Sequence, residues 1–367
     1  MSKKPHINIP RRIGTHFLAI FGPSRTSESR AHAVRNAIVS GHRFVTNAKR
    51  IVTIGGGTGT FVVLSALKSL SGVSLSAVVS VADDGGSTGR LRDSYGFLPL
   101  GDARQALVAL AKDGTMLRDI FTYRFSKGDI AGHNLGNLLL TALTDKLGSD
   151  GAAIRAVSEI LRVRGYVVPV SDFPATLVAE LEGGERIVGQ HAINARPAGG
   201  PAIVGLSVSE KISLADQAEL AVDSADFIIL GPGDLYTSTL ANFAVPGLKE
   251  AVRKSNACLI YFVNIFSTAS ETSGYSASKH VAEIEAYAGR KPDHIIMHTG
   301  HIPADILEYY EKKNAFPVID DLGDDPRVVR GTFADVVPLH KIEGDVIERS
   351  LIRHDPKKIA EVIQSFL

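Results

Sequence analysis

The 367-residue sequence predicts an α/β protein in three layers, in which helices cover both faces of a mainly parallel sheet and a small β-rich insertion interrupts the pattern. Three observations predict this fold. Short apolar runs alternate with helical periods from Lys49 onward, and several of these runs stop at glycine-rich loops. Residues 165–210 instead contain short β-rich segments between Gly, Pro and Asp turns.

The first half of the domain begins with a strand, a glycine turn and a helix. Ile51 to Ile54 is a β-branched run that stops at three consecutive glycines, and apolar residues then recur with a helical period over residues 61–70. The next strand is predicted over residues 75–81. Helices are predicted over residues 102–111, 116–123, 134–147 and 152–161.

The second half contains the insertion and a return to alternating strands and helices. Strands of the insertion are predicted over residues 166–170, 175–182, 186–192 and 203–208. The later strands are predicted over residues 227–230, 258–264 and 294–298, and helices over residues 214–221, 279–288 and at the C-terminus. We therefore expect a domain of residues 49–367, with an insertion at about 165–210, preceded by an arm of residues 1–48.

Four polar loops follow predicted strands. Their sequences are GGGTG, VADDGGSTGRLR, GPGDLYTS and NIFSTASETSGYSASKH. Ligands of open α/β sheets bind at the carboxyl ends of the strands. Because these four loops should converge at one edge of the sheet, the sequence predicts a nucleotide-type site there.

The first loop is suited to a phosphate or a sugar. Glycines let backbone N–H groups approach a phosphate closely, and the start of the following helix adds partial positive charge. No Gly-Lys-Ser/Thr follows, so the turn is not a P-loop. The alternative is a plain tight turn. The expected ligand contacts in this loop are Gly56, Gly57, Thr58 and Gly59.

The second loop combines acids, glycines and arginines. Asp83 and Asp84 point in opposite directions on an extended segment, so we expect one to bind a ligand or Mg²⁺ and the other to cap the following turn. Arg90 and Arg92 can bind phosphate or carboxylate, with solvated charge as the alternative. The expected ligand contacts in this loop are Asp83, Gly85, Gly86 and Ser87, and the expected metal ligands are Asp83 and Asp84.

Two helix starts add further candidates. Asp102 and Arg104 open one helix, where the alternative role of Asp102 is an N-cap. Asn137 lies at the start of another helix, in the stretch GHNLGN, and is an expected ligand contact. If the protein is an enzyme, the catalytic candidates are Asp83, Asp84, Asp102, Arg90 and Arg104.

The two later loops supply backbone amides and aromatic rings. Gly231 and Gly233 can hold a pyrophosphate or a sugar through their backbone. Tyr236 is either a core residue or a base-stacking residue. Tyr275 lies in a loop rich in Ser and Thr, where an aromatic side chain is suited to stacking on a base or hydrogen bonding.

Other chemistries are not supported. No His, Cys or Asp spacing indicates zinc, and no GxSxG motif indicates a hydrolase. A dehydrogenase that binds NAD at the glycine turn is a minor alternative, because the spacing from the turn to the next acids is irregular. Cys258 is the single cysteine and lies in an apolar run, which predicts a buried thiol and a cytoplasmic protein.

The formal net charge of +1 conceals a basic arm on an acidic body. Residues 1–50 contain ten Lys or Arg and one acid, which leaves thirty basic and thirty-eight acidic residues in the rest of the chain. We expect the arm to be flexible, and it is either a mobile tail or a contact to an anionic surface. No transmembrane segment and no nucleic-acid partner are expected.

Several stretches match one family in order from Lys49 to the C-terminus. They are IVTIGGGTGT, VVSVADDGGSTGRLR, GDARQALVALA, GHNLGNLLLTAL, IILGPGDLYTSTL, ETSGYSASKH and IRHD. The chain thereby resembles the bacterial gluconeogenesis factors, which are related to 2-phospho-L-lactate transferase. The resemblance implies a Rossmann-like fold.

The resemblance also implies one of two activities. The gluconeogenesis-factor branch binds UDP-N-acetylglucosamine and supports cell shape and cell-wall synthesis on gluconeogenic carbon, without an established reaction. The transferase branch moves a phospholactyl group from a GDP-activated donor to a deazaflavin, with Mg²⁺. ETSGYSASKH and IRHD are similar to the first branch, so the resemblance assigns nucleotide-sugar contacts to Tyr275 and Arg353, near Thr58. In the loop GPGDLYTS, Asp234 stands where the family usually has serine, and it adds negative charge close to the predicted phosphate site.

These observations predict a cytoplasmic regulatory protein that binds UDP-N-acetylglucosamine or a similar nucleotide diphosphate. The alternative is a Mg²⁺-dependent transferase of the 2-phospho-L-lactate type. Mg²⁺ is the one cofactor that the acids suggest, and no other cofactor is expected. The sequence leaves open whether the chain forms a homo-oligomer.

Overall fold

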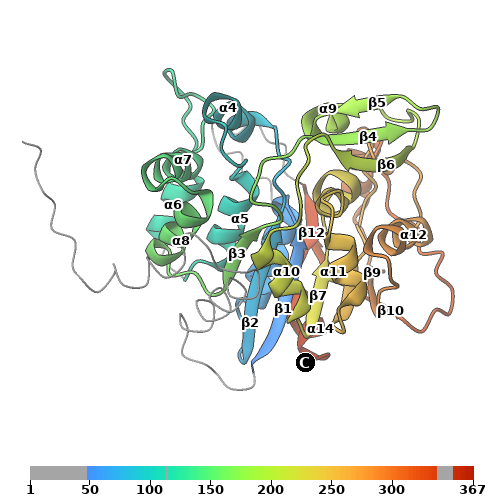
Figure 1. The fold of residues 1–367 in the computed structure, drawn as a ribbon. Helices are drawn as coiled ribbons and strands as arrows, with labels where there is room; N and C mark the ends of the chain where they lie inside the picture. The colour runs from blue at the N-terminus through green and yellow to red at the C-terminus, as the bar shows by residue number, and fades with distance from the viewer. Residues whose placement is uncertain (1–47, 113–114, 337–349) are drawn as a thin grey trace, which may run out of the picture. The chain divides into compact units, whose positions relative to one another are not determined.

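The computed structural model describes residues 48–112, 115–336 and 350–367. The predicted arm lies outside the described residues except for Ala48, so it stays a prediction. Seven of the described strands form one parallel sheet (Figure 1). Their spatial order is β10 (Val328–Gly331), β9 (His294–His298), β8 (Cys258–Phe262), β7 (Phe227–Leu230), β1 (Lys49–Gly55), β2 (Val73–Val79) and β3 (Tyr166–Pro169).

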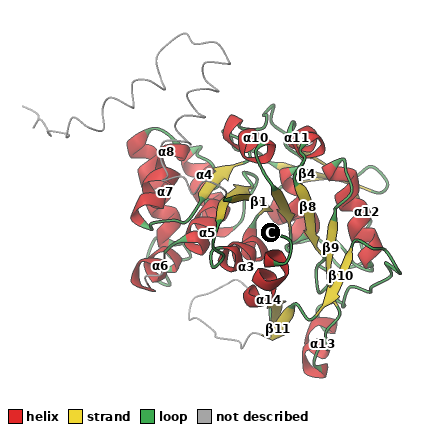
Figure 2. Cartoon of the chain, turned by 90° about the horizontal axis from the view of Figure 1, so that it is seen from below, coloured by secondary structure: helices red, strands yellow, loops and turns green. Residues whose placement is uncertain are grey.

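The central strands are apolar because helices cover both faces of the sheet. Every residue of β1 from Ile51 to Gly55 is buried, and so is all of β7. One face is covered by α3 (Gly57–Leu67), α5 (Gly101–Leu110) and α14 (Pro356–Gln364), and the other by α10 (Asp216–Asp223), α11 (Leu248–Lys254) and α12 (Ala277–Ala288) (Figure 1, Figure 2). The predicted α/β fold with a parallel sheet is confirmed.

The other described helices lie around this sheet. They are α4 (Gly86–Tyr95), α6 (Thr115–Thr122), α7 (Leu135–Leu147), α8 (Asp150–Ile160), α9 (Gln190–Asn194), α13 (Ala304–Glu311) and the short helical turns η1 (Leu235–Thr239) and η2 (Leu240–Asn242). Within the described ranges, no helix combines the length and the apolar character that crossing a membrane requires.

The β-rich insertion contains a small antiparallel sheet. Its strands, in spatial order, are β5 (Arg186–Val188), β4 (Leu177–Leu181) and β6 (Ile203–Val208). Two details of the prediction are wrong. Residues 166–169 are instead the edge strand β3 of the main sheet, and their apolar run without alternation is typical of a parallel strand. Residues 186–192 divide into β5 and α9 at Gly189, whose φ of 101° turns the chain.

The second polar loop is shorter than predicted, because residues 86–95 form α4. Glycine and serine have poor helix propensity, so the sequence pattern conceals this helix. It begins after Gly85, which provides no side-chain cap, and it ends at Gly96 in the left-handed conformation. The start of α4 therefore lies directly after the two adjacent aspartates.

The strand order reverses between β1 and β7. After β1 the chain adds β2 and β3 on one side, and it later returns to place β7 on the other side of β1. The helix after β1, α3, and the helix that follows η1 and η2 after β7, α11, cover opposite faces of the sheet (Figure 1, Figure 2). In open α/β sheets, ligands bind at the carboxyl ends of the strands at such a reversal.

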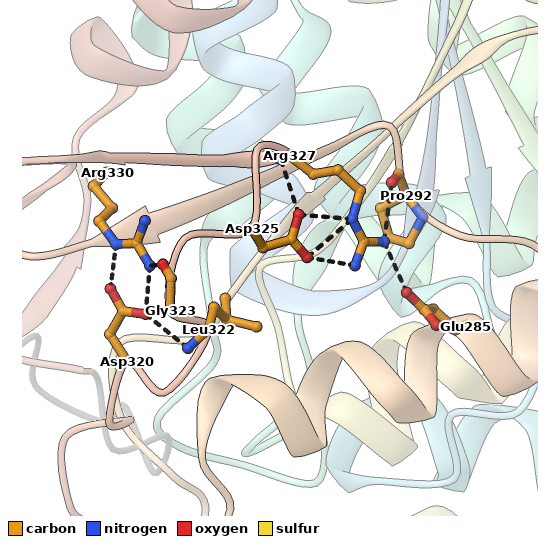
Figure 3. Close-up of polar contacts among 8 residues, drawn as sticks. All are labelled: Glu285, Pro292, Asp320, Leu322, Gly323, Asp325, Arg327 and Arg330. Atoms are coloured by element: carbon orange, nitrogen blue, oxygen red, sulfur yellow. Dashed lines mark hydrogen bonds and ion pairs between the residues drawn. The ribbon is translucent and has the colours of Figure 1, made fainter.

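Ion pairs fix the loop that precedes β10 (Figure 3). Arg327 contacts Asp325 at 2.6 Å and Glu285 of α12 at 2.8 Å, and Arg330 contacts Asp320 at 2.6 Å. The next residue, Asp321, accepts hydrogen bonds at 2.8 Å from the backbone N–H and at 2.6 Å from the hydroxyl of Ser278, in the first turn of α12. This loop therefore anchors the start of α12, immediately after the polar loop that carries Tyr275.

A two-stranded sheet precedes the last helix. It pairs β11 (Ala334–Val336) with β12 (Ile352–His354) in antiparallel order, and β12 contacts α3. The C-terminal helix α14 then packs on α3 (Figure 2). These elements lie on the α3 face of the main sheet.

Candidate functional site

The glycine turns after β1 and β7 are packed against each other. A Cβ atom at Gly59, in the first turn of α3, would overlap the backbone carbonyl of Pro232. Gly231, at the end of β7, has a φ of 68°. Only glycine permits the close approach at position 59, so the two turns form one backbone-lined edge at the strand-order reversal.

Asp102 reaches this edge from α5. Its Oδ1 accepts the N–H of Gly57 at 2.8 Å, and a Cβ atom at Gly56 would overlap its carboxylate. The alternative role as an N-cap is wrong, because Leu100 is the N-cap of α5 and Asp102 lies buried in the first turn. With the Gly57 N–H taken, Thr58 and Gly59 are the first-turn residues of α3 whose N–H groups have no acceptor within the helix.

Burial dominates the electrostatics of Asp102. Desolvation, reinforced by the charge of Asp83, raises the pKa of Asp102 to about 7. Desolvation also raises the pKa of Asp83, whose Oδ1 accepts the N–H of Gly85 at 2.9 Å. The two carboxyls therefore form an acidic pair in which ionisation of one opposes ionisation of the other.

Arg104 accompanies the acidic pair. Its Nε donates to Oδ1 of Asn137 at 2.8 Å. Desolvation lowers the pKa of Arg104 to about 10, and the two acids oppose this shift. One arginine balances one of the two carboxylates, so a shared proton, a cation or a donor group of a ligand is needed to balance the second.

Asp84 points to the insertion instead. Its Oδ1 accepts the N–H of His191 at 2.7 Å, and a Cβ atom at Gly189 would be 2.5 Å from its Oδ2. The predicted divergence of the two adjacent aspartates is confirmed, and one of them caps the following turn as predicted. Asp83 caps the following turn, and Asp84 caps α9, which fastens the insertion to the second loop.

Asn137 and the remaining candidates of the second loop contact neighbouring helices and loops. Asn137 donates to the hydroxyl of Thr88 at 3.3 Å, and Ser87 accepts the N–H of Asn134 at 3.2 Å. Arg90 donates to the Ala131 carbonyl at 3.3 Å, and Arg92 donates to the Ala175 carbonyl at 3.4 Å. Both arginines thus contact neighbouring loops, and Arg92 also pairs with Asp93 of its own helix at 3.3 Å, whereas Asn137 contacts Arg104 of the acidic cluster.

Asn264 holds the second glycine turn, and it was not among the predicted site residues. Its Nδ2 donates to the Gly233 carbonyl at 2.8 Å, and its Oδ1 accepts the Gly233 N–H at 3.4 Å. The signal that identifies it is an amide placed two residues after the end of β8. Such a side chain can satisfy both backbone groups of a facing glycine.

Glu271 is a second missed residue. Its Oε2 accepts the N–H of Tyr236 at 2.9 Å, and its Oε1 accepts the hydroxyl of Thr237. Burial, reinforced by Asp234, raises the pKa of Glu271 to about 8. Burial also raises the pKa of Asp234, which accepts a hydrogen bond from Thr268 at 3.1 Å. Glu271 therefore ties the loop after β8 to the start of η1.

The structure brings Tyr236 and Tyr275 together. Their hydroxyl oxygens are 3.0 Å apart, and their rings meet edge to face with centroids 6.4 Å apart. Tyr236 is fully buried, so of its two predicted roles it is a core residue. Tyr275 is partly exposed, and the ammonium group of Lys279 lies 5.5 Å from its ring centroid.

Arg353 lies on β12, opposite Asp335 in the antiparallel pair and on the α3 face of the sheet. The described residues contain no group of three His, Cys, Asp or Glu side chains arranged to hold a metal ion. The acidic pair of Asp83 and Asp102 provides two carboxylates. Mg²⁺ is commonly bound by one or two carboxylates together with phosphate oxygens, so this pair fits Mg²⁺ only in combination with a ligand.

Comparisons with known proteins match nearly the whole domain. Residues 51–333 match the family model described as 2-phospho-L-lactate transferase CofD. The gluconeogenesis factor of Halalkalibacterium halodurans is 39% identical over 319 residues, which cover 86% of this chain and 95% of that protein. The gluconeogenesis factor of Bacillus subtilis is 36% identical over 321 residues, which cover 87% and 98%.

A solved structure shares the fold. It is the crystal structure of a UPF0052 family member from Bacillus halodurans, with a TM-score of 0.78 and 36% sequence identity. The alignment covers 86% of this chain and 99% of the crystallised one. The residues that match the family model, 51–333, include strands on both sides of the strand-order reversal.

Proposed function

The chain belongs to the 2-phospho-L-lactate transferase CofD family, where its curated relatives are named gluconeogenesis factors, and from this premise we propose that it is a regulatory protein that binds a nucleotide-diphosphate sugar. UDP-N-acetylglucosamine is the proposed ligand. In this proposal the bound state regulates how carbon is divided between central metabolism and the cell wall, and thereby cell shape.

The observation that carries the proposal is the pair of packed glycine turns at the strand-order reversal. Backbone N–H groups at the start of α3 can bind phosphate oxygens without a cationic side chain. Gly59 and Pro232 are in contact, so a diphosphate bound there would touch both turns. The proposed diphosphate contacts are the backbone groups of Thr58, Gly59 and Gly233.

Tyr275 and Arg353 are the proposed side-chain contacts. Tyr275 retains exposed surface beside the loop of η1, where its ring can contact the uracil or the sugar. Arg353 lies on the α3 face, where its guanidinium can pair with a phosphate. The acids of the pair, Asp83 and Asp102, can accept hydrogen bonds from sugar hydroxyls when ionised.

Calorimetric titration tests this proposal. The purified protein is titrated with UDP-N-acetylglucosamine and separately with GDP, each with and without Mg²⁺. We expect tight binding of the UDP-sugar, and a Kd at least about tenfold weaker in Tyr275→Ala and in Arg353→Ala, equal to about 1.4 kcal/mol. Arg155→Ala, an exposed position on α8, is the control and should bind as the parent does. Absence of UDP-sugar binding by the parent would reject the proposal.

The acidic pair favours a second candidate, a Mg²⁺-dependent transferase. Asp83 and Asp102 would hold Mg²⁺ with the phosphates of a GDP-activated donor, and Mg²⁺ would neutralise charge that develops on the diphosphate. Arg104 would stabilise the same charge through its guanidinium. In this case Mg²⁺ strengthens GDP binding by the parent, and Asp83→Asn removes that effect and the turnover with a deazaflavin acceptor. A parent protein without turnover would exclude this candidate.

A further inference from the structure

Two buried histidines lie at the same edge of the sheet as the glycine turns. In the sheet register Ile296 pairs with Phe262, and His298 is two residues further along β9. Side chains two residues apart on a strand share a face. His298 therefore lies on the same face as Phe262, and the ring of His354 meets Phe262 edge to face with centroids 5.9 Å apart.

His298 and Asn264 lie at the carboxyl ends of neighbouring parallel strands. The pairing of β8 with β9 ends at Phe262 and Ile296, and Asn264 and His298 each lie two residues beyond that pair. Asn264 is bonded to both backbone groups of Gly233. His298 thus extends the edge that begins at the glycine turns by one strand, from β8 to β9.

A backbone contact fixes the protonation of His298. The N–H of Phe333 donates to Nδ1 of His298 at 3.0 Å, so Nδ1 carries a lone pair and the neutral ring carries its proton on Nε2. Burial lowers the pKa of His298, which keeps the ring neutral near pH 7. The Nε2–H group is a buried donor without a partner among the described residues.

His354 adds a second buried ring at this place. Its Nε2 likewise has no partner in the described part of the chain. Burial is the main cause that lowers the pKa of His354 to about 3, and the nearby His298 is the second cause, so this ring is also neutral. Burying unpaired polar atoms costs free energy, and two of them in neighbouring side chains indicate a site that a ligand completes.

The protonation state decides the chemistry of that ligand. A metal-bound histidine offers the lone pair of one ring nitrogen and donates a proton from the other. His298 has the opposite arrangement, because its Nδ1 accepts from the backbone and its Nε2 is the donor. The partner of Nε2–H is therefore an acceptor oxygen, and a metal ion is not suited to this position.

We propose that the Nε2–H of His298 donates a hydrogen bond to an oxygen atom of the nucleotide ligand, which makes His298 a specificity-determining residue. This inference rests on the proposed function, because it assigns one more contact to the same ligand. His354 lines the same place as a neutral ring and excludes water from the contact. The acceptor is a phosphate oxygen or a sugar oxygen.

Two substitutions separate ligand binding from structural support. In His298→Asn the side-chain oxygen can replace Nδ1 as the acceptor of the Phe333 N–H, and the Nε2 donor is lost. In His298→Gln the amide nitrogen can replace Nε2 as a donor, and the Nδ1 acceptor is lost. His301→Asn, an exposed position three residues later, is the control.

Calorimetry with UDP-N-acetylglucosamine and with UDP measures ligand binding by these variants, and thermal melts measure their stability. We expect His298→Asn to melt near the parent temperature and bind at least about tenfold more weakly, and His298→Gln to melt lower and bind within about threefold of the parent. Weaker binding of both ligands places the acceptor oxygen on the UDP moiety that they share, and weaker binding of the UDP-sugar alone identifies an oxygen of the N-acetylglucosamine.

Three outcomes overturn the inference. Unchanged affinity in His298→Asn removes the contact while the proposed function stands. Equal loss of affinity in both variants shows that His298 only supports the fold. A parent protein that binds neither UDP nor the UDP-sugar rejects the proposed function together with this inference.

Discussion

Replacing Asp102 by asparagine should make the protein more stable, and by an amount that grows with pH. The pKa of Asp102 is raised from 3.8 to about 7, chiefly by burial. The unfolded chain therefore releases this proton above about pH 4, whereas the folded chain retains it until about pH 7. The parent loses stability over this window, because folding then requires proton uptake. Asparagine stays neutral in both states and keeps an oxygen for the N–H of Gly57.

The shift of the Asp102 pKa sets the size of the effect. About three pKa units at about 1.4 kcal/mol each give an upper value of about 4 kcal/mol above pH 7. At pH 4.5 the same relation gives about 1 kcal/mol. The unfolding entropy of about 320 residues is roughly 0.7 kcal/mol/K, so the larger value corresponds to a melting temperature about 6 °C higher.

Thermal melts at pH 4.5, 6 and 8 check this reasoning. They are recorded by circular dichroism for the parent, Asp102→Asn and the control Asp145→Asn, which changes an exposed aspartate on α7. The control should follow the parent at all three pH values. If Asp102→Asn melts below the parent at pH 8, or if its gain is the same at every pH, the argument from burial is refuted.

Three further substitutions test other parts of the structure. Gly59→Ala places a Cβ atom on the Pro232 carbonyl and should lower the free energy of unfolding, measured in urea, by about 2 kcal/mol or more. The control Gly151→Ala on α8 has only ordinary contacts and should raise the free energy of unfolding by about 0.5 kcal/mol. Equal effects of the two substitutions would contradict the close approach at Gly59. Asp321→Ala removes the hydrogen bonds to Ser278 and should lower the free energy of unfolding by about 1 kcal/mol in the same assay. The control is Asp324→Ala, which changes an exposed aspartate three residues later. A similar loss of stability in the control would argue against a specific cap at Asp321. Glu271→Gln replaces an acid whose pKa is raised from 4.5 to about 8, so its gain in melting temperature over the parent should grow between pH 5 and 8, and a loss at pH 9 would disprove this.

Several features of this protein follow from local sequence alone. The apolar run of β1 and the glycines after it predict a strand, a turn and a helix, and the structure has all three. The alternation of side chains along an extended segment predicts that Asp83 and Asp84 diverge, which their separate partners confirm. These predictions succeed because each depends on the geometry of a few consecutive residues.

Other features depend on contacts between distant parts of the chain. The sequence suggests that Asp102 is an N-cap, but its carboxylate binds Gly57, forty-five residues away, and burial there sets its pKa. Glu271 and Asn264 carry no local motif, and their roles come from the facing loop of η1 and Gly233. The Nε2–H tautomer of His298 is set by the backbone of Phe333 on another segment.

The sequence by itself thus determines that strands and helices alternate through most of the domain and that polar loops follow several of the strands. Only the tertiary structure decides which carboxyls lie together, which N–H groups are already bonded and which ring nitrogen keeps its proton. The physical reason is that a strand or a turn is encoded within a few residues. Desolvation and hydrogen bonding at the site depend on neighbours that the sheet brings together from positions tens to more than one hundred residues apart.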